Sequence, residues 1–308
     1  MSDTRFYYND FSSFLRDSLG CKVQKITLDG GFTCPNRDGT LGRGGCTYCN
    51  NQTFSPAYCH RNRPIAKQMR EGIKFFAHKY PQMKYIAYFQ AYTNTYGSLD
   101  RLAALYEEAL AVEGTVGIVI GTRPDCVSDE LLDYLSELSK RTFMIVEYGI
   151  ESTNDSTLLR INRGHDYATA VNAVERTVER GIRVGAHFIF GLPGESPTML
   201  VEQAAVISRL PLTTLKLHQL QLIRGTRMAR EYEEVPQDFS LFSLDEYVET
   251  VVDFVERLRP DIVLERFASS SPKELLIAPD WGVKNFELVE MVKRRMRERD
   301  TWQGKLYE

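Results

Sequence analysis

Three cysteines in one glycine-rich loop constrain this chain more than any other sequence feature. Cys46 and Cys49 form a C-x-x-C pair, and Cys34 lies twelve positions before Cys46. Metal centres held by thiolates commonly use four cysteines. A set of three therefore predicts a metal cluster with one iron left open, and an open coordination position is where a metal site does chemistry.

The rest of this loop is suited to wrap around a bulky group. Residues 29–49 contain six glycines, which let the backbone take positive φ angles and approach a ligand closely. Arg37 and Arg43 can offset thiolate charge. An alternative is a zinc knuckle, because Cys59 and His60 follow ten residues after the C-x-x-C pair and could complete a four-ligand site.

The composition excludes several classes of protein. With 308 residues and 43% apolar side chains, the chain can bury a core without disulfides, so six cysteines indicate metal or redox chemistry. The net charge of −3 gives no global positive field for nucleic acid, although a local patch can still serve. The first ten residues lack the apolar segment of a signal peptide, and no run approaches 18 apolar residues. We therefore expect a cytoplasmic protein with no membrane partner.

Strand-like and helix-like segments alternate along the chain. Apolar, β-rich runs recur about every thirty residues, at 23–28, 84–90, 116–121, 143–149, 183–190 and 215–223. Amphipathic stretches separate most of them, at 99–112, 128–139, 167–180 and 198–210. This alternation predicts βαβ units around a parallel sheet, and hence an α/β fold, a partial (β/α)6 barrel.

We expect three parts. Residues 1–20 form a helical lead-in, residues 21–225 form the partial barrel, and residues 226–308 form a C-terminal α/β extension packed on it. The extension holds a helix near 243–258, a strand candidate at 262–267 and a basic helix near 285–299. In parallel α/β folds the site lies at the C-terminal ends of the strands, so the residues after each strand are the candidates for function.

With these features in place, the chain resembles the radical S-adenosylmethionine (SAM) superfamily. The usual signature is C-x3-C-x2-C with an aromatic residue before the last cysteine, and Tyr48 matches that aromatic, while the first gap is eleven residues instead of three. Longer first gaps are seen in the branch similar to Elp3-like tRNA-modifying enzymes. The loop CPNRDGTLGRGGCTYC is similar to that of the bacterial YhcC/YtqA-type proteins, and the resemblance covers nearly the whole chain.

The resemblance implies a fold, an activity and two cofactors. Cys34, Cys46 and Cys49 would bind three irons of a [4Fe–4S] cluster, and SAM would chelate the fourth iron. Reduction of SAM would then give methionine and a 5′-deoxyadenosyl radical that abstracts hydrogen from the substrate. Such an enzyme needs an electron donor such as flavodoxin or ferredoxin, and the accessible cluster makes it oxygen-sensitive.

The resemblance also assigns SAM contacts to residues at successive strand ends. Tyr92 and Thr93 stand where the superfamily receives the methionyl amino group. Glu151 would accept hydrogen bonds from the ribose hydroxyls, and Arg163 would pair with the SAM carboxylate. The alternatives are an acidic residue at a helix N-terminus for Glu151 and a surface cation for Arg163.

Two more contacts come from the fifth strand. His187 stands where relatives carry a polar ribose contact, although a lone strand histidine is usually a satisfied core residue. Gly191 opens a G-L-P-G-E segment that contacts adenine through its backbone in radical SAM proteins. We expect the two isolated cysteines, Cys59 and Cys126, to be structural.

Only the resemblance to the Elp3-like branch indicates a substrate. Elp3-like relatives act on the wobble uridine of tRNA, so we expect a tRNA uridine side chain as the target. Basic residues that could contact phosphate are Lys22, Lys25, Arg61, Arg63 and those of 293–299. A solvated helix face is the other interpretation of the last group, because acidic residues interleave with it.

Three alternatives of different kinds stay open. The first is a radical SAM enzyme acting on a small molecule. The second is a zinc-stabilised RNA-binding module without catalysis. The third is an ordinary barrel hydrolase or isomerase, which the sequence disfavours because it contains neither a G-x-S-x-G nor an H-E-x-x-H motif.

Overall fold

The fold is built on one parallel sheet. A computed structural model describes residues 7–77 and 82–308 and contains a seven-stranded sheet of order β1-β2-β3-β4-β5-β6-β8. Each neighbouring pair of strands is parallel. The strands are β1 (Val23–Leu28), β2 (Lys84–Phe89), β3 (Thr115–Thr122), β4 (Phe143–Glu151), β5 (Arg183–Phe190), β6 (Thr214–Gln219) and β8 (Val263–Arg266).

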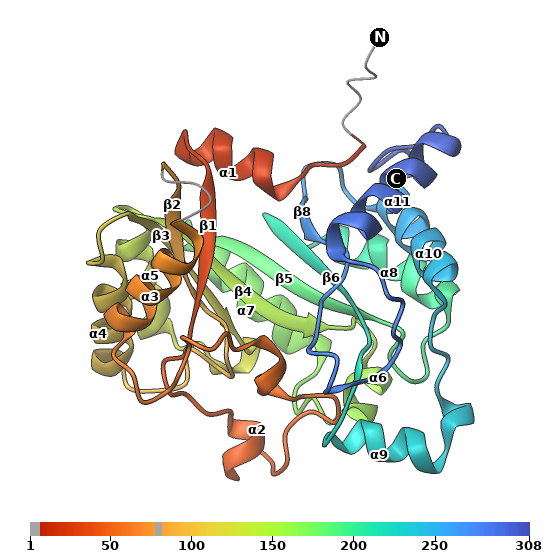
Figure 1. Cartoon of the computed structure of the whole chain (residues 1–308), viewed down its shortest axis with the longest axis horizontal. Helices are drawn as coiled ribbons and strands as arrows, with labels where there is room; N and C mark the ends of the chain where they lie inside the picture. Colours follow the sequence, from red (N-terminus) through yellow and green to blue (C-terminus); the bar gives the residue numbers. More distant parts are fainter. Residues whose placement is uncertain (1–6, 78–81) are drawn as a thin grey trace.

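The sheet curls into the predicted partial barrel, and its seventh strand comes from the C-terminal part of the chain (Figure 1). The curl brings the two edge strands toward each other, since Lys25 Nζ of β1 lies 2.7 Å from Glu265 Oε2 of β8. Helices cover the outer face of the sheet (Figure 1). The larger ones are α3 (Ile65–Ala77), α4 (Leu99–Leu110), α5 (Asp129–Ser139), α7 (Tyr167–Glu179), α8 (Pro197–Ser208) and α10 (Leu244–Arg257).

Shorter and terminal elements complete the chain. The remaining helices are α1 (Phe11–Leu19), α2 (Pro35–Asp38), α6 (Asp155–Arg160), α9 (Arg227–Glu234) and α11 (Asn285–Glu298). Short 3-10 helices lie at Asn51–Phe54, Pro124–Cys126 and Pro236–Asp238. Within the described ranges, no helix combines the length and apolar character needed to cross a membrane.

The helices begin where polar side chains can satisfy their free N–H groups. Ser128 accepts a hydrogen bond from the backbone N–H of Leu131 at the start of α5. Ser243 and Glu246 form a reciprocal capping box at the start of α10. Such caps fix the first turn of each of these helices after the loop that leads into it.

The two faces of the sheet pack differently. On the outer face, side chains such as Ile118 and Ile120 are fully buried under the helices in the main core. Val119, which lies between them, points to the inner face and packs with Phe11 and Leu15 of α1. Helix α1 therefore fills the end of the half-barrel where the strands begin.

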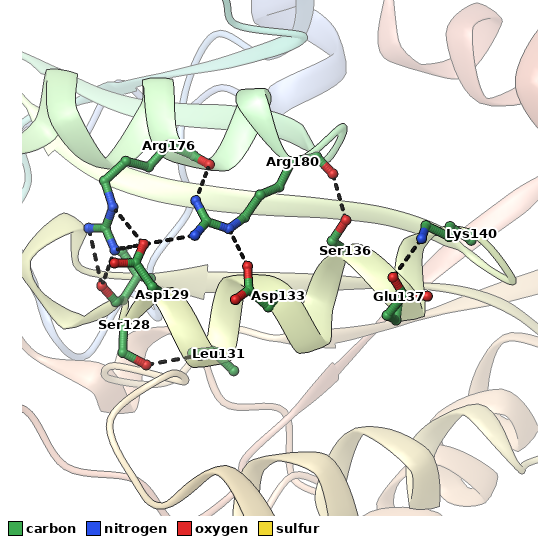
Figure 2. Close-up of polar contacts among 10 residues, drawn as sticks. Ser128, Asp129, Leu131, Asp133, Ser136, Glu137, Lys140, Arg176 and Arg180 are labelled. Atoms are coloured by element: carbon green, nitrogen blue, oxygen red, sulfur yellow. Dashed lines mark hydrogen bonds and ion pairs between the residues drawn. The ribbon is translucent and has the colours of Figure 1, made fainter.

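Polar contacts also join the outer helices. Arg176 and Arg180 of α7 both reach Asp129 of α5, at 2.8 and 2.9 Å, and Arg180 also contacts Asp133 at 2.6 Å (Figure 2). We call these four residues the α5–α7 network. Its two carboxylates are each 68% exposed, so solvent screens these ion pairs.

One predicted element is wrong in detail. The expected continuous strand at 215–223 ends at Gln219, and Leu222–Ile223 forms a separate strand, β7, paired antiparallel with β9 (Leu276–Ala278). The hydrophobic pattern runs through this break because Leu220 and Leu222 stay buried in a small cluster with Met228 of α9. Periodicity alone therefore could not mark the break.

Candidate functional site

A cavity of about 200 Å³ lies at the C-terminal ends of the strands, as the parallel topology requires. It is lined by nine of the ten residues singled out from the sequence. These are Cys34, Cys46, Tyr48, Cys49, Tyr92, Thr93, Glu151, Arg163 and His187. Gly191 does not line it. The structure thus brings together side chains that come from the first cysteine loop and from the ends of β2, β4 and β5.

Arg37 and two glycines fix the conformation of the cysteine loop. Arg37 Nη2 donates a hydrogen bond to the carbonyl oxygen of Cys49 at 3.0 Å. Gly44 and Gly45 have φ angles of 89° and 79°, a region that favours glycine. A Cβ atom at Gly45 would lie 2.7 Å from Nε of Arg37, so a larger residue there would displace the arginine.

Nitrogen donors lie beside two of the three sulfur atoms. Arg163 Nη1 lies 3.4 Å from Cys46 Sγ, and Asn51 Nδ2 lies 3.5 Å from Cys49 Sγ. Burial and the neighbouring Cys46 and Cys34 together raise the pKa of the Cys49 thiol to about 11, although Arg37 opposes the shift. The three thiols are therefore close enough to repel one another as thiolates, and an added cation would favour all three.

The donor set does not fit a single metal ion. Among the described residues, no three His, Cys, Asp or Glu side chains converge on one ion position. Cys59 and His60 do not line the cavity, and the Cys59 thiol is buried elsewhere, where burial and nearby Asp29 raise its pKa to about 12. Cys59 and His60 therefore do not join the three cysteines at the cavity, as the zinc-knuckle alternative requires. Three separated thiolates instead suit a cluster in which each sulfur binds its own iron.

Backbone strain is concentrated around the cavity. Four described non-glycine residues have positive φ, namely Tyr92, Glu151, Asn162 and Asp300. Tyr92 and Glu151 line the cavity, and Asn162 Nδ2 donates to the carbonyl oxygen of Gly45 in the cysteine loop. Such strained residues persist only where the surrounding structure fixes them, and they cluster at functional sites.

Arg163 and Glu151 face each other across a glycine. Arg163 Nη2 donates to the carbonyl oxygen of Gly149 at 2.5 Å and lies 3.7 Å from Glu151 Oε1. A Cβ atom at Gly149 would lie within 2.6 Å of both side chains. Burial opposes the charge of Arg163, but Tyr48, Cys46 and Glu151 together raise its pKa well above the ordinary value. Both side chains are buried, so neither a surface cation nor a helix-capping acid describes them.

Several polar atoms at the cavity wall have no partner within the described part of the chain. Thr93 Oγ1 is buried without a hydrogen bond, and so is Nε of Arg163. Buried polar atoms are usually paired, because each unpaired one costs about 1–3 kcal/mol. Orphaned atoms that line a cavity are what a bound polar ligand would satisfy.

His187 is not a free-standing strand histidine. Its Nε2 lies 3.0 Å from Glu147 Oε2, and its ring centroid lies 5.4 Å from that of His218 on β6. Burial and the nearby Lys216 lower the pKa of His187, so the ring is neutral near pH 7. His187 therefore faces the cavity as a neutral imidazole whose orientation is fixed by the carboxylate of Glu147.

Below the cavity lies a buried charge cluster that the sequence predictions missed. Lys25 and Lys216 each contact both Glu147 and Glu265, at distances of 2.6 to 3.2 Å. The side chains of Glu147 and Lys216 are only 1% and 2% exposed. We call these four residues the lumen cluster. The ammonium group of Lys216 also donates a hydrogen bond to the hydroxyl oxygen of Tyr88 at 2.9 Å.

A signal for the lumen cluster was present in the sequence. Glu147 and Lys216 each interrupt a run of apolar strand residues, and their side chains point to the inner face together with that of Lys25. Burial opposes ionisation of Glu147, but Lys216 and Lys25 hold its pKa well below the ordinary value. A charged residue inside an apolar strand therefore marked the lumen.

The structure places Gly191, Lys25 and the basic residues of α11 outside the cavity lining. Gly191 has a φ angle of 88° and packs beside the ring of Phe242, outside the cavity lining. Lys25 belongs to the lumen cluster and is not available to phosphate. The basic residues Arg295 and Arg299 form ion pairs with Glu249 of α10. These two residues therefore join α11 to α10, which neither the phosphate contact nor the solvated helix face had predicted.

Comparison with known proteins agrees with this architecture. A family model described as the radical SAM superfamily matches residues 34–205, and one described as the radical SAM C-terminal domain matches residues 212–298. The chain is 38% identical to YtqA of Bacillus subtilis over 307 residues, covering 100% of this chain and 95% of that protein. It is 36% identical to YhcC of Escherichia coli over 274 residues, covering 89% and 87%.

More distant matches extend the comparison. A tRNA uridine(34) acetyltransferase of Methanocaldococcus infernus is 24% identical over 209 residues, which is 65% of this chain and 38% of that protein. The solved structure of Elp3 from the same organism, lacking its N-terminus, superimposes with a TM-score of 0.69 at 18% identity and covers 91% of this chain and 64% of that one. This likeness confirms the partial-barrel fold.

The superfamily match spans more than half of the 308 residues and includes the segment from Cys34 to Cys49 and the ends of β2, β3, β4 and β5. The two bacterial relatives cover most of the chain at more than 30% identity, which confirms the expected YhcC/YtqA-type resemblance. This chain therefore belongs to the radical SAM superfamily, and it is an enzyme of that class with SAM and a [4Fe–4S] cluster as cofactors.

Proposed function

We propose that this enzyme binds its [4Fe–4S] cluster through Cys34, Cys46 and Cys49, cleaves SAM reductively, and modifies the wobble-uridine side chain of a tRNA. One observation carries the first two steps. The three cysteines share a single cavity with Glu151 and Arg163, although these five residues are spread over 130 positions of the sequence.

The chain's own residues prepare the cluster end of the cavity. When bound, the cluster supplies the electron that splits SAM into methionine and a 5′-deoxyadenosyl radical. Arg163 and Asn51 place N–H donors beside Cys46 and Cys49, which stabilises thiolate charge. Arg37 holds the loop by its contact with the Cys49 carbonyl.

The remaining lining residues suit the polar ends of SAM. Thr93 offers an unpaired hydroxyl beside the strained residue Tyr92, where the methionyl amino group would lie. Glu151 can accept from two ribose hydroxyls, and neutral His187 offers a second ribose contact. The guanidinium of Arg163 keeps one unpaired nitrogen, Nε, for the SAM carboxylate. Arg163 and His187 are held before the ligand arrives, by the Gly149 carbonyl oxygen and by Glu147 respectively.

An external protein must deliver the electron. Leu41, at the outer turn of the cysteine loop, is 58% exposed, and the arginine at position 43 beside it is exposed too. A small acidic electron carrier such as a flavodoxin or ferredoxin would meet an apolar and basic surface there, close to the cysteines.

The tRNA substrate is supported by relatives and by a small number of surface residues. A tRNA uridine(34) acetyltransferase shares 24% identity with two thirds of this chain. Arg224 and Arg227 are exposed beside Ile223, a residue that lines the cavity, and they could contact phosphates near the cavity rim.

The radical step has a direct test. Protein reconstituted without oxygen, with SAM and dithionite, is expected to form 5′-deoxyadenosine. Cys46→Ala should lose this product by more than 100-fold together with most of its iron, whereas the matched Cys21→Ala, which lies outside the cavity lining, should behave as wild type. Product formed at the wild-type rate by Cys46→Ala, or one zinc and no iron in the wild-type protein, would refute the assignment.

The substrate needs a separate test. Modified nucleosides in tRNA from cells lacking this enzyme should differ from those of the parent strain at the wobble uridine. Identical nucleoside profiles would remove the tRNA proposal and favour a small-molecule substrate, while 5′-deoxyadenosine formation would still stand.

A further inference from the structure

The long gap between Cys34 and Cys46 is closed at its base by a backbone contact. The N–H of Gly45 donates a hydrogen bond to the carbonyl oxygen of Asn36 at 2.8 Å. Counted across this hydrogen bond, only Pro35, Asn36 and Gly45 separate the two cysteines, and residues 37–44 form a side loop. The closure therefore shortens the path along the chain between two of the three thiols.

The side loop carries its own backbone hydrogen bonds. The N–H of Gly39 donates to the carbonyl oxygen of Gly42 at 3.0 Å, and the N–H of Leu41 donates to that of Pro35 at 2.9 Å. A Cβ atom at Gly42 would lie 2.4 Å from Oδ1 of Asn36, so a larger residue there would push against the closed base. The side loop is therefore compact, and its shape depends on where Asn36 lies.

Asn162, in the segment between α6 and α7, contacts both sides of this base. Its Nδ2 donates to the carbonyl oxygen of Gly45 at 2.9 Å, and its own carbonyl oxygen accepts from Nδ2 of Asn36 at 2.6 Å. Asn36 is only 2% exposed. We call Asn36, Gly45 and Asn162 the asparagine clamp, because their three hydrogen bonds join the cysteine loop to a segment more than 100 positions away.

The clamp is directly connected to Arg163, the next residue in the chain. Nη1 of Arg163 lies 3.4 Å from Cys46 Sγ. The carbonyl oxygen of Arg163 accepts a hydrogen bond from Nη1 of Arg123 at 2.8 Å, and Asp125 in turn holds Arg123 at 2.7 and 2.8 Å. The carbonyl groups of residues 162 and 163 are thus both fixed by side-chain donors, so the guanidinium of Arg163 extends from a fixed backbone.

Asn162 takes a strained conformation in this position. Its φ angle of 53° lies in the left-handed region, which costs a non-glycine residue about 1–3 kcal/mol. Glycine adopts this region without that cost, so glycine would suit a turn that had no further role. The side-chain amide is what asparagine adds here, and it is the group that binds Gly45.

We infer that Asn162 is a positioning residue for both cofactors. It closes the cysteine loop for the cluster and fixes the backbone of Arg163 for the SAM carboxylate, so one residue couples the two sites. Asn162 does not line the cavity itself. The inference rests on the proposed function, in which the three cysteines hold the cluster and Arg163 contacts SAM.

Two variants separate the amide of Asn162 from its shape. Asn162→Gly keeps the left-handed backbone and removes the amide, whereas Asn162→Asp keeps the side-chain shape and removes the N–H donor. After anaerobic reconstitution, the rate of iron loss to a chelator is measured, and SAM affinity is measured on preparations of equal iron content. Each variant should lose iron about tenfold faster and bind SAM about tenfold more weakly, which corresponds to about 1.4 kcal/mol for one lost hydrogen bond.

The matched control is Asn172→Ala, because Asn172 is exposed on α7 and does not line the cavity. It should match wild type in both measurements, and circular dichroism should show that all three variants fold. If either Asn162 variant matched wild type in iron retention or in SAM affinity, the inference would be overturned, since the amide would then not serve both cofactors. Formation of 5′-deoxyadenosine by wild type tests the radical step separately. Its absence from protein that holds iron and binds SAM would remove the proposed reaction and leave the positioning role standing.

Discussion

Two groups of charged side chains on opposite sides of the same sheet allow a direct comparison. The α5–α7 network on the outside and the lumen cluster on the inside both consist of basic and acidic side chains at contact distances below 3.3 Å. They differ in solvent exposure. The carboxylates of the outer network are 68% exposed, whereas Glu147 in the lumen is 1% exposed.

Because of this difference in exposure, the two groups of ion pairs affect the stability of the fold differently. Water screens the outer ion pairs, so each adds little to stability and can be replaced freely. In the lumen, each charge depends on its partners, because a buried charge without a partner is very costly. The lumen cluster therefore has to be kept complete or removed in balanced pairs. Because Glu147 also holds His187 beside the cavity, the cluster connects this constraint to ligand binding.

The largest expected effect comes from breaking the lumen cluster at its acidic centre. Glu147→Ala leaves Lys25 and Lys216 sharing only Glu265. We expect the free energy of unfolding to fall by about 3–5 kcal/mol, the usual cost of an uncompensated buried charge. Urea unfolding of the anaerobic protein, followed by circular dichroism, measures it. A loss below 1 kcal/mol would show that water reaches the lumen and that the contrast between the two networks is false.

Lys216 makes the lumen respond to alkaline pH. Burial lowers its pKa to about 8 from the ordinary 10.5, although Glu147 and Glu265 oppose the shift. Between these two values the unfolded chain holds a proton that the folded chain has lost, so the contribution of Lys216 to stability rises with pH. The slope is at most about 1.4 kcal/mol per pH unit. Comparing urea unfolding of wild type and Lys216→Met from pH 8 to 10 isolates this contribution, and parallel curves would contradict it.

Removing charges in a balanced pair should cost much less than removing one. The double variant Glu147→Leu with Lys216→Met leaves Lys25 paired with Glu265. Its free energy of unfolding should lie within about 1.5 kcal/mol of wild type, since well-packed apolar residues often replace a buried ion pair. If the double variant is as unstable as Glu147→Ala, packing around these residues, and not charge balance, controls the lumen.

The smallest effect is expected on the outside. Asp129→Asn removes two contacts of the α5–α7 network (Figure 2), yet it should cost less than about 1 kcal/mol. Raising the salt concentration to 1 M should reduce even that difference, because salt screens exposed charges. The same urea experiment at low and high salt checks both statements. If Asp129→Asn lowered the free energy of unfolding as much as Glu147→Ala does, the exposed and the buried ion pairs would not differ in their effect on stability.

Much of the fold was predictable because parallel strands leave a regular hydrophobic signal. The strands at 23–28 and 183–190 match β1 and β5 residue for residue, and the strand candidate at 262–267 became β8. The cavity was predictable for a related reason. Residues just after parallel strands meet at one edge, so Tyr92 and Glu151 meet the cysteine loop there.

Other features were hidden because they depend on partners distant in the sequence. Lys25 is separated from Glu265 by 240 positions, so nothing near either residue announces their contact. The end of β6 depends on the amide of Gln219 binding Ser269, and the apolar pattern continues past it. His218 lies within β6, and only the structure shows that its buried Nε2 has no partner among the described residues.

The position of helix α1 also has a consequence for the order in which reactants bind and products leave. Phe11 and Leu15 occupy the start of the half-barrel, and the lumen cluster lies between them and the cavity. Among the described residues, the cavity therefore opens at the other end of the strands. In the proposed reaction on tRNA, an RNA seated over that opening would cover SAM, so SAM would bind before the RNA and its products would leave after it.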